Sequence, residues 1–133
     1  MKLRLQGNSL RLRLTRSEVL RLDDHGAVEE AASFRSGGSL TYRIQSRTGI
    51  EPLHADFTGG AITVLIPAET VRAWAAGDEV GLYAQDGDLR IAIEKDFRCL
   101  TRAEEEPDAY PHPPSDFEEE SGNAHYDRRQ AGE

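Results

Sequence analysis

The sequence predicts an α+β fold, mainly β, in which two tandem repeats pack against each other. The first observation is internal repetition: shifted by 52 positions, the chain matches itself without a gap for about 26 residues. The coinciding apolar residues and glycines run from Leu3 opposite Ala55, through Gly7 opposite Gly59, to Val28 opposite Val80. The second is that each half has the hydrophobic periodicity of strand, turn, strand, helix, strand, turn, strand. A repeat of about 45 residues buries little core alone, so the two are expected to share one.

The first repeat opens with a hairpin and a helix. "KLRLQ" and "SLRLRL" alternate with period two around Gly7-Asn8, a two-residue hairpin turn with glycine first. Thr15 is followed three residues later by Glu18, the pattern of a capping box at a helix start. Val19 and Leu22 share one face of this helix, and "DDHG" ends it. We therefore expect both side chains in the core.

The remaining elements follow the same order. Strands near 27–34 and 39–46 are joined through "SGG" and complete the first repeat. In the second repeat "LHADF", "GG" and "AITVLI" form a hairpin. Proline then opens a helix over 67–76 with Val71 and Trp74 on its buried face. "EVGLYA" and "LRIAIE" make the last hairpin, around Asp86-Gly87.

Charge divides the chain into a body and a tail. The net charge is −8, yet residues 1–50 hold nine Lys/Arg against five Asp/Glu, and residues 51–102 hold five against nine. Residues 103–133 hold two against ten and are rich in proline. We expect one compact domain over 1–102, made of repeats at about 1–50 and 53–98. The acidic tail over 103–133 is expected to be disordered, because it cannot bury enough apolar surface.

The cysteine content and the lengths of the apolar stretches predict the cellular compartment. Cys99 is the only cysteine, so no internal disulfide can form, as is usual in the reducing cytoplasm. The first residues never form the apolar run of a signal peptide, and no stretch approaches the roughly 18 apolar residues of a membrane span. We expect a cytoplasmic protein without membrane contact.

Two stretches resemble a known family. "AITVLIPAETVRAWAAGDEVGLYAQDGDLRIAIEK" is similar to the swapped-hairpin module of AbrB-like transition-state regulators, and "GNSLRLRLTRSEV" followed by "DD" resembles MazE-type antitoxins. The likeness covers roughly residues 2–97, with two copies in one chain as in MraZ-like proteins. It implies a pseudo-two-fold swapped-hairpin sheet or barrel. The whole chain is also similar to small uncharacterised bacterial proteins ending in "EKDFRCL…DAYPHP", a likeness that implies no activity.

The resemblance implies a DNA-binding regulator or antitoxin-like protein, with DNA contacted by the basic first hairpin and a protein partner bound by the acidic tail. The implied DNA-binding residues are Lys2, Arg4, Asn8, Ser9, Arg11, Arg13 and Arg16. The tail residues expected to bind a protein are Tyr110, Phe117, Glu118, Glu119 and Glu120. The second repeat departs from this pattern, with Asp56 in place of Arg4 and Thr63 in place of Arg11. The chain therefore either forms a homodimer or, as a monomer with an internal pseudo-dimer, has lost DNA binding.

The basic residues of the first hairpin would face one another. A turn at 7–8 sets Arg4 opposite Arg11 and Lys2 opposite Arg13, and directly opposed like charges destabilise a sheet by about 0.2–1 kcal/mol per pair. Three anions could compensate them: DNA phosphate, the acidic tail, or acids on neighbouring strands. The neighbouring acids considered are Glu29, Glu30, Glu94 and Asp96. A contiguous positive face favours DNA. Interleaved acids favour a protein-interaction module that has lost DNA binding and in which the second half's acidic surface and exposed strand edges recruit a protein.

Catalysis is not expected. The sequence has no glycine-rich phosphate loop, no G-x-S-x-G and no H-E-x-x-H. The histidines are scattered without ligand spacing, at His25, His54, His112 and His125. Cys99 has no histidine beside it that would activate a thiolate. We therefore expect a non-enzyme without cofactor or metal, whose partners are duplex DNA and a protein.

Overall fold

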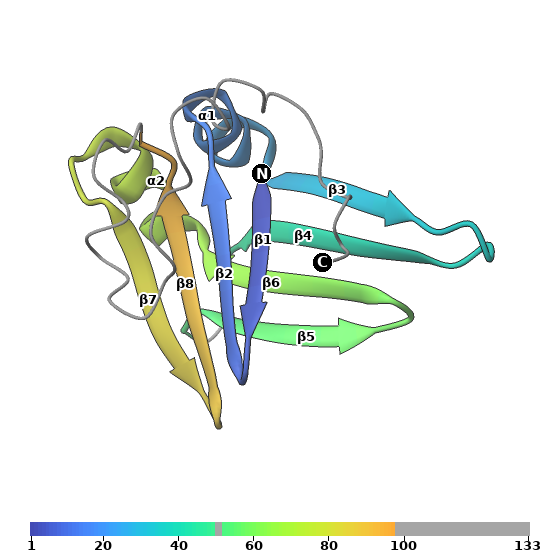
Figure 1. Ribbon diagram of the computed structural model, residues 1–133. Coiled ribbons are helices and arrows are strands. Elements are labelled where there is room, and N and C mark those ends of the chain that lie inside the picture. The colour runs from blue at the N-terminus through green and yellow to red at the C-terminus, as the bar shows by residue number, and fades with distance from the viewer. Residues whose placement is uncertain (50–51, 98–133) are drawn as a thin grey trace, which may run out of the picture. The chain divides into compact units, whose positions relative to one another are not determined.

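A computed structural model describes residues 1–49 and 52–97 (Figure 1). The elements of the first repeat are β1 (Lys2–Gln6), β2 (Ser9–Leu14), α1 (Arg16–His25), β3 (Ala27–Ser33) and β4 (Ser39–Arg47). Those of the second are β5 (His54–Thr58), β6 (Ala61–Pro67), α2 (Ala68–Ala76), β7 (Gly81–Asp86) and β8 (Leu89–Lys95). The mainly β class and the tandem strand–strand–helix–strand–strand order are confirmed.

The two repeats exchange hairpins. The strand orders are β1-β2-β8-β7 in one sheet, here called sheet A, and β3-β4-β6-β5 in the other, called sheet B. Each hairpin is antiparallel, but the central pairs β2–β8 and β4–β6 are parallel and join strands of different repeats. The first hairpin of one repeat thus lies beside the last hairpin of the other, which confirms the swapped-hairpin arrangement. In Figure 1 the strands of sheet A run across those of sheet B.

The core lies between the sheets and is closed by the helices. Alternate residues of the central strands point inward, so Leu12, Ile93, Ile44 and Val64 are fully buried. Val19 and Leu22 of α1 and Val71 and Trp74 of α2 complete the same apolar cluster, as predicted. Full burial of such a side chain contributes about 1.5–3 kcal/mol. Because both repeats supply this cluster, neither has a core of its own.

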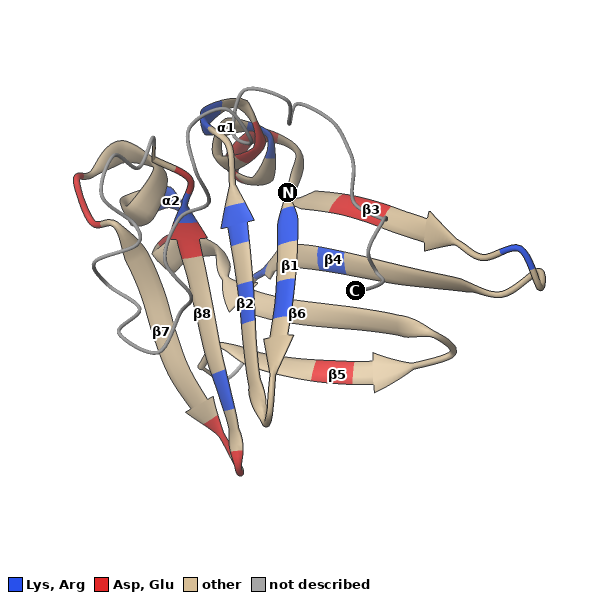
Figure 2. Ribbon diagram, viewed as in Figure 1, with Lys and Arg blue, Asp and Glu red and all other residues tan. Residues whose placement is uncertain are grey.

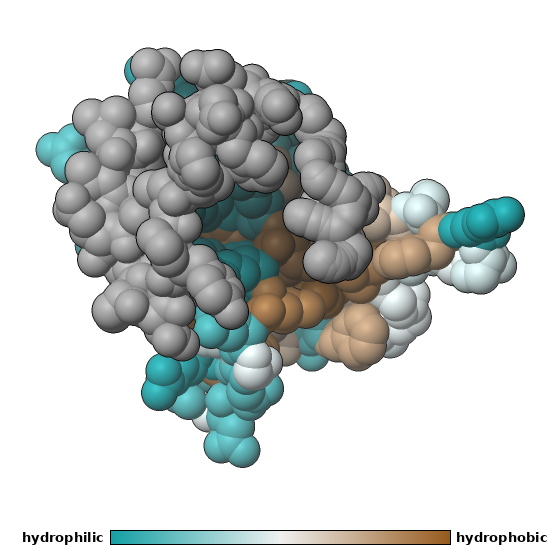
Figure 3. Space-filling view, in the orientation of Figure 1, coloured by the Kyte–Doolittle hydropathy of each residue, from teal (hydrophilic) through white to brown (hydrophobic). Residues whose placement is uncertain are grey.

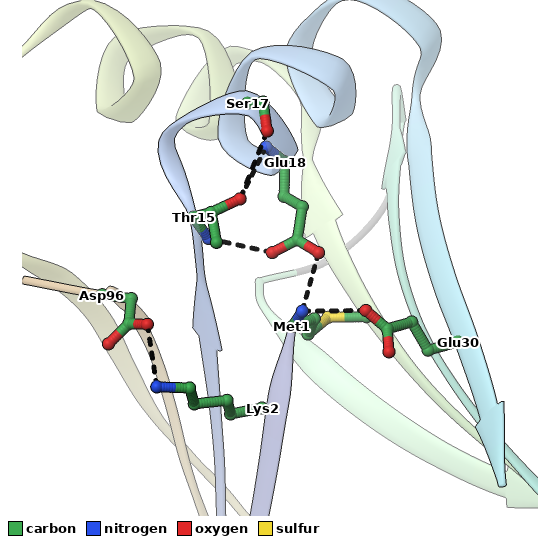
Figure 4. Close-up of polar contacts among 7 residues, drawn as sticks. All are labelled: Met1, Lys2, Thr15, Ser17, Glu18, Glu30 and Asp96. Atoms are coloured by element: carbon green, nitrogen blue, oxygen red, sulfur yellow. Dashed lines mark hydrogen bonds and ion pairs between the residues drawn. The ribbon is translucent and has the colours of Figure 1, made fainter.

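Local signals fix the ends of α1. The Thr15 hydroxyl accepts a hydrogen bond from the Glu18 backbone N–H at 3.3 Å, and the Glu18 carboxylate accepts one from the Thr15 N–H at 2.9 Å (Figure 4). The predicted capping box is therefore confirmed. Gly26 ends the helix in the left-handed region with φ 89°, where glycine carries no Cβ penalty. The cap sets the direction in which the chain leaves β2 for the helix layer.

The repeat correspondence holds through the helices and then shifts. The sequence match sets Val28 opposite Val80. In the structure Val28 is buried and pairs with Ile44, whereas Val80 is 52% exposed and precedes β7. The counterpart of Val28 is Leu82, which pairs with Ile93. Residues 77–80 separate α2 from β7, while Gly26 alone separates α1 from β3. Because this connection is longer, the corresponding residues of β7 lie two positions later than the sequence match predicts.

The last hairpin turn also lies one residue later than predicted. Asp86 pairs with Leu89 as the final residue of β7, so the turn is Gly87-Asp88 rather than Asp86-Gly87. Gly87 adopts φ 61°, which places the glycine first, as at Gly7 with φ 56°. The Asp86 carboxylate instead accepts a hydrogen bond from the Ala55 N–H at 3.1 Å. This acid links the hairpins of the two sheets, a role that its place beside a turn did not indicate.

Several predictions concern residues beyond Phe97. The acidic tail over 103–133, the five residues predicted there to bind a protein, Cys99, His112 and His125 all lie outside the described residues. Within residues 1–49 and 52–97, neither helix is long and apolar enough to cross a membrane.

Candidate interaction surface on the first hairpin

Five cationic side chains share the outer face of sheet A. The pairs Lys2–Arg13 and Arg4–Arg11 are in the predicted register. Their neighbours Leu10, Leu12 and Leu14 point inward, so these cations lie on the opposite face. Arg90, on the adjacent β8 opposite Ser9, is exposed on that side too. We call Lys2, Arg4, Arg11, Arg13 and Arg90 the cation face. Figure 2 shows Lys and Arg on β1, β2 and the start of β8.

Glu94 lies within the cation face. It pairs with Arg13 across the parallel β2–β8 ladder. Its Oε1 atom lies 3.3 Å from Arg13 Nε and 3.4 Å from Arg11 Nε. The Tyr83 hydroxyl donates a hydrogen bond to its Oε2 atom at 2.8 Å. Arg11 Nε is buried and has an ion pair but no hydrogen bond. One carboxylate from the second repeat therefore lies against two arginines from the first and offsets part of their charge.

The same carboxylate acts on the Tyr83 phenol. Burial raises the pKa of Tyr83 above its ordinary value, and the hydrogen bond and negative charge of Glu94 raise the pKa further. Arg11 and Arg13 act in the opposite direction. Tyr83 is thereby held as a neutral donor to Glu94.

Asp96 is the second acid that lies against a cation of the first hairpin, whereas the side chains of Glu29 and Glu30 bind other groups. Asp96 Oδ2 lies 3.1 Å from Lys2 Nζ (Figure 4). Glu29 pairs instead with Arg43, its cross-strand neighbour on sheet B, at 2.6 Å. Of the four acids considered from the sequence, Glu94 on β8 and Asp96 just beyond it contact cations of the first hairpin. Acids are therefore interleaved with the positive charges.

Glu30 binds the N-terminus. The Met1 amine lies 2.7 Å from Glu18 Oε2 and 2.8 Å from Glu30 Oε2 (Figure 4). Burial by itself would lower the pKa of this amine, but the hydrogen bonds and charges of the two carboxylates raise the pKa above 8.0. Burial alone would raise the pKa of Glu18. The amine and the two hydrogen bonds of the Thr15 cap outweigh this effect, so the pKa of Glu18 lies below its ordinary value. These contacts tie the start of β1 to α1 and β3.

The other predicted DNA-binding residues are dispersed. The Asn8 side chain donates a hydrogen bond to the Asp88 carbonyl at 2.7 Å, so it joins the two turn tips of sheet A. Arg16 begins α1 and is not part of the sheet. Arg4 donates a hydrogen bond to Gln6 at 3.2 Å. Among the residues that the structure describes, neither Arg4 nor Arg90 has an ion pair.

An uncovered apolar surface lies beside the first hairpin. Phe57 and Tyr42 both pair with Ile62, which points to the same side of sheet B as the buried Val64. Phe57 is nevertheless 69% exposed, and Leu5 on the core-facing side of β1 is 57% exposed. We call Leu3, Leu5, Tyr42, Phe57 and Ile62 the apolar shelf. In Figure 1 sheet B continues past the edge formed by β1, and Figure 3 shows apolar surface continuing from sheet A onto sheet B.

The edge of β1 beside this shelf is open. β1 is the first strand of sheet A, and β2 is its only neighbour among the described strands. An edge strand presents N–H and C=O groups that can pair with another strand. Sequence reasoning missed this site, because the alternation of Leu3 and Leu5 indicates a core face without showing where the opposite sheet ends.

The remaining polar groups of the described residues include two histidines. His54 Nδ1 lies 2.9 Å from the Pro52 carbonyl oxygen, and His25 ends α1. Within residues 1–49 and 52–97, no three metal-ligating side chains lie close enough to hold an ion.

The fold and the site define a small, mainly β protein with internally exchanged hairpins, an open edge strand and a cation face interrupted by acids. The chain belongs to the family of unknown function DUF7009, whose family model matches residues 1–114. No curated protein and no solved structure matches it. The family match continues for seventeen residues past Phe97.

Proposed function

We propose that this protein is a non-catalytic interaction module that binds an extended protein segment along the open edge of β1. One observation carries the proposal: among the described strands β1 has a single neighbour, and it borders apolar side chains that remain exposed. Exposed apolar surface beside polar residues is typical of an interaction site. A strand added to β1 would gain backbone hydrogen bonds and would cover Leu5.

The two faces of β1 define the partner's chemistry. In a strand added to a sheet edge, successive side chains alternate between the two faces. One face of β1 presents Leu3 and Leu5, and the other presents Lys2 and Arg4. Apolar residues suit the first face and acidic residues the second. The segment bound is therefore extended and alternates acidic with apolar side chains.

The interleaved acids favour this function over DNA binding. DNA phosphates would have to compete with Glu94 for Arg11 and Arg13, and with Asp96 for Lys2. Lys2 is 73% exposed, so its pair with Asp96 is worth at most about 1 kcal/mol and can be exchanged. Glu94 is 14% exposed and contacts three side chains, so it is not readily displaced.

We expect a short labelled peptide that alternates glutamate and leucine to bind the full-length protein, measured by fluorescence anisotropy. Leu5→Asp should weaken this binding at least tenfold, because it sets a negative charge on the apolar side of the added strand. Val80→Asp is the matched control, since Val80 is similarly exposed but lies outside sheet A. A peptide alternating lysine and leucine should bind poorly. Equal binding of both peptides, or equal loss in both variants, would refute the proposed edge site.

A DNA-binding regulator is the second candidate, favoured by the five cations on three adjacent strands and by the resemblance to AbrB-like proteins. Binding of this kind depends on phosphate contacts and falls steeply with salt. Under this second candidate, a labelled random-sequence duplex would bind at low salt and would be released as salt rises. Arg11→Glu with Arg13→Glu should abolish binding. If the double variant binds the duplex as the wild type does, the cation face is not the DNA site.

A further inference from the structure

We propose that the uncovered end of sheet B binds a second copy of this chain, with the two sheet ends packed face to face across a two-fold axis. The apolar residues on the core-facing side of this end, here called the sheet B overhang, are Ala32, Leu40, Tyr42, Phe57 and Ile62. The inference goes beyond the proposed function, because it concerns the face of sheet B and not hydrogen bonding along the edge of β1.

Exposure rises along the strands of sheet B toward the two hairpin turns. In β4, Ile44 is fully buried, whereas Leu40 on the same face and nearer the turn is half-buried. In β3, Val28 is buried and Ala32 is exposed, and in β5 the residue near the turn, Phe57, is 69% exposed. The turn ends of both hairpins therefore extend past the described strands of sheet A, as Figure 1 shows.

The overhang carries almost no charge. Of the charged residues on the strands of sheet B, only Glu30 shares the core-facing side, and it binds the Met1 amine at 2.8 Å. The others point to the opposite face, because side chains alternate along a strand. These are Glu29, Arg43, Arg47 and Asp56. Two overhangs can therefore approach each other without repulsion between like charges.

A second copy cannot cover the overhang by extending sheet A. Antiparallel pairing of β1 with β1 of another copy requires a two-fold axis perpendicular to sheet A. Such an axis keeps sheet B of both copies in one layer, so each overhang would occupy the space of the other. A second copy that meets the overhang must therefore do so face to face.

The step between the two sheets fits its own copy. A two-fold axis parallel to β1 and midway between the layers turns the second copy over. Its overhang then lies on the first overhang, beside β1 and in the layer of sheet A. Stacked sheets pack about 10 Å apart, whether they belong to one chain or to two. Each copy thus supplies the layer that the other lacks.

The contact is small, so we expect a reversible dimer. Sheet B has four strands, and three strand spacings amount to about 14 Å. Contacts of this extent belong with transient interfaces, which bury less than about 1,200 Å² in total. Because Tyr42, Phe57 and Ile62 also belong to the apolar shelf, a segment added to β1 competes with the second copy. Self-association thereby limits how much of the shelf is open to an outside partner.

Sedimentation equilibrium of the full-length chain tests the inference. We expect a monomer–dimer equilibrium with a dissociation constant between about 10 μM and 1 mM. Phe57→Asp should weaken self-association at least tenfold, whereas Val80→Asp, at an exposed position outside both sheets, should not. A wild-type chain that stays monomeric up to about 1 mM would overturn the inference. Association beyond the dimer would do so too, because a two-fold contact closes at two copies.

Cysteine trapping locates the contact. Cys99→Ser removes the only native thiol. Leu40→Cys then places one thiol per chain on the overhang, between Tyr42 and the turn and so close to the axis. Ser39→Cys is the matched control, since it lies on the opposite face of the same strand. We expect mild oxidation to link Leu40→Cys chains in pairs far faster than Ser39→Cys chains, and equal rates would overturn the inference.

The glutamate–leucine peptide separates this inference from the proposed function. If both hold, the peptide binds and dissociates the dimer. If the chain dimerises but does not bind the peptide, the overhang pairs with its own copy and the edge of β1 serves no such segment. If the peptide binds and the chain stays monomeric at every concentration, the edge site stands and the inference fails.

Discussion

Replacing Leu12 with alanine should lower the free energy of unfolding by about 2–5 kcal/mol, the usual range for a fully buried leucine. Leu12 has no exposed surface and lies in register between Leu3 of its own hairpin and Ile93 of the exchanged one. The cavity would therefore open between strands of both repeats. We expect the second repeat to unfold together with the first, in a single transition.

Tryptophan fluorescence measures this coupling. Trp74 is the only tryptophan, is fully buried and belongs to the second repeat, so it reports on the repeat that was not altered. In urea unfolding of Leu12→Ala, its transition should move to lower denaturant together with the circular dichroism signal. Leu20→Ala, on an exposed part of α1, is the control and should change stability by less than about 0.5 kcal/mol. A Trp74 transition that stays unchanged in Leu12→Ala would show that the repeats unfold independently.

Glu94→Gln should lower the free energy of unfolding by about 1–3 kcal/mol, because a neutral amide replaces the charge shared by Arg11 and Arg13. It should also lower the pKa of Tyr83. Burial would still raise that pKa, but the carboxylate that adds to the rise would be gone and the two arginines would remain. Titration of the Tyr83 ring signals by NMR measures the change directly.

The pH dependence of stability should follow. In the wild type the folded pKa of Tyr83 lies above that of the unfolded chain, so ionisation opposes folding and stability falls as pH rises past about 10. This fall should be smaller in Glu94→Gln. Glu29→Gln is the control: its partner Arg43 is on sheet B and the pair is exposed, so the loss should stay below about 1 kcal/mol. Equal effects of the two substitutions would contradict the central place given to Glu94.

Features set by neighbouring residues were predictable from the sequence. The register of the first hairpin follows from its turn, and the start of α1 follows from Thr15 and Glu18. The acidic partner of Arg11 and Arg13 could not be predicted from neighbouring residues. Glu29 and Glu30 are nearer in sequence, but the ladder that brings Glu94 to Arg13 joins residues 81 positions apart. Composition and periodicity do not show which hairpins become neighbours.

The apolar shelf shows a second limit. Phe57 has the pairing and direction of a core residue, yet it is 69% exposed, because the described strands of sheet A do not cover it. The alternation along a strand indicates which side chains face inward, but the extent of the opposite layer depends on how two sheets cross. The same reason explains why the exposed edge of β1 was not anticipated from the sequence.

The exchange of hairpins also determines the order in which strands can pair while the chain is being synthesised. β2 acquires its parallel neighbour only when β8 has been made, about eighty residues later. At the usual rates of translation this interval is roughly 4–16 s. During that time the nascent first hairpin has its leucines uncovered and its four cations without Glu94.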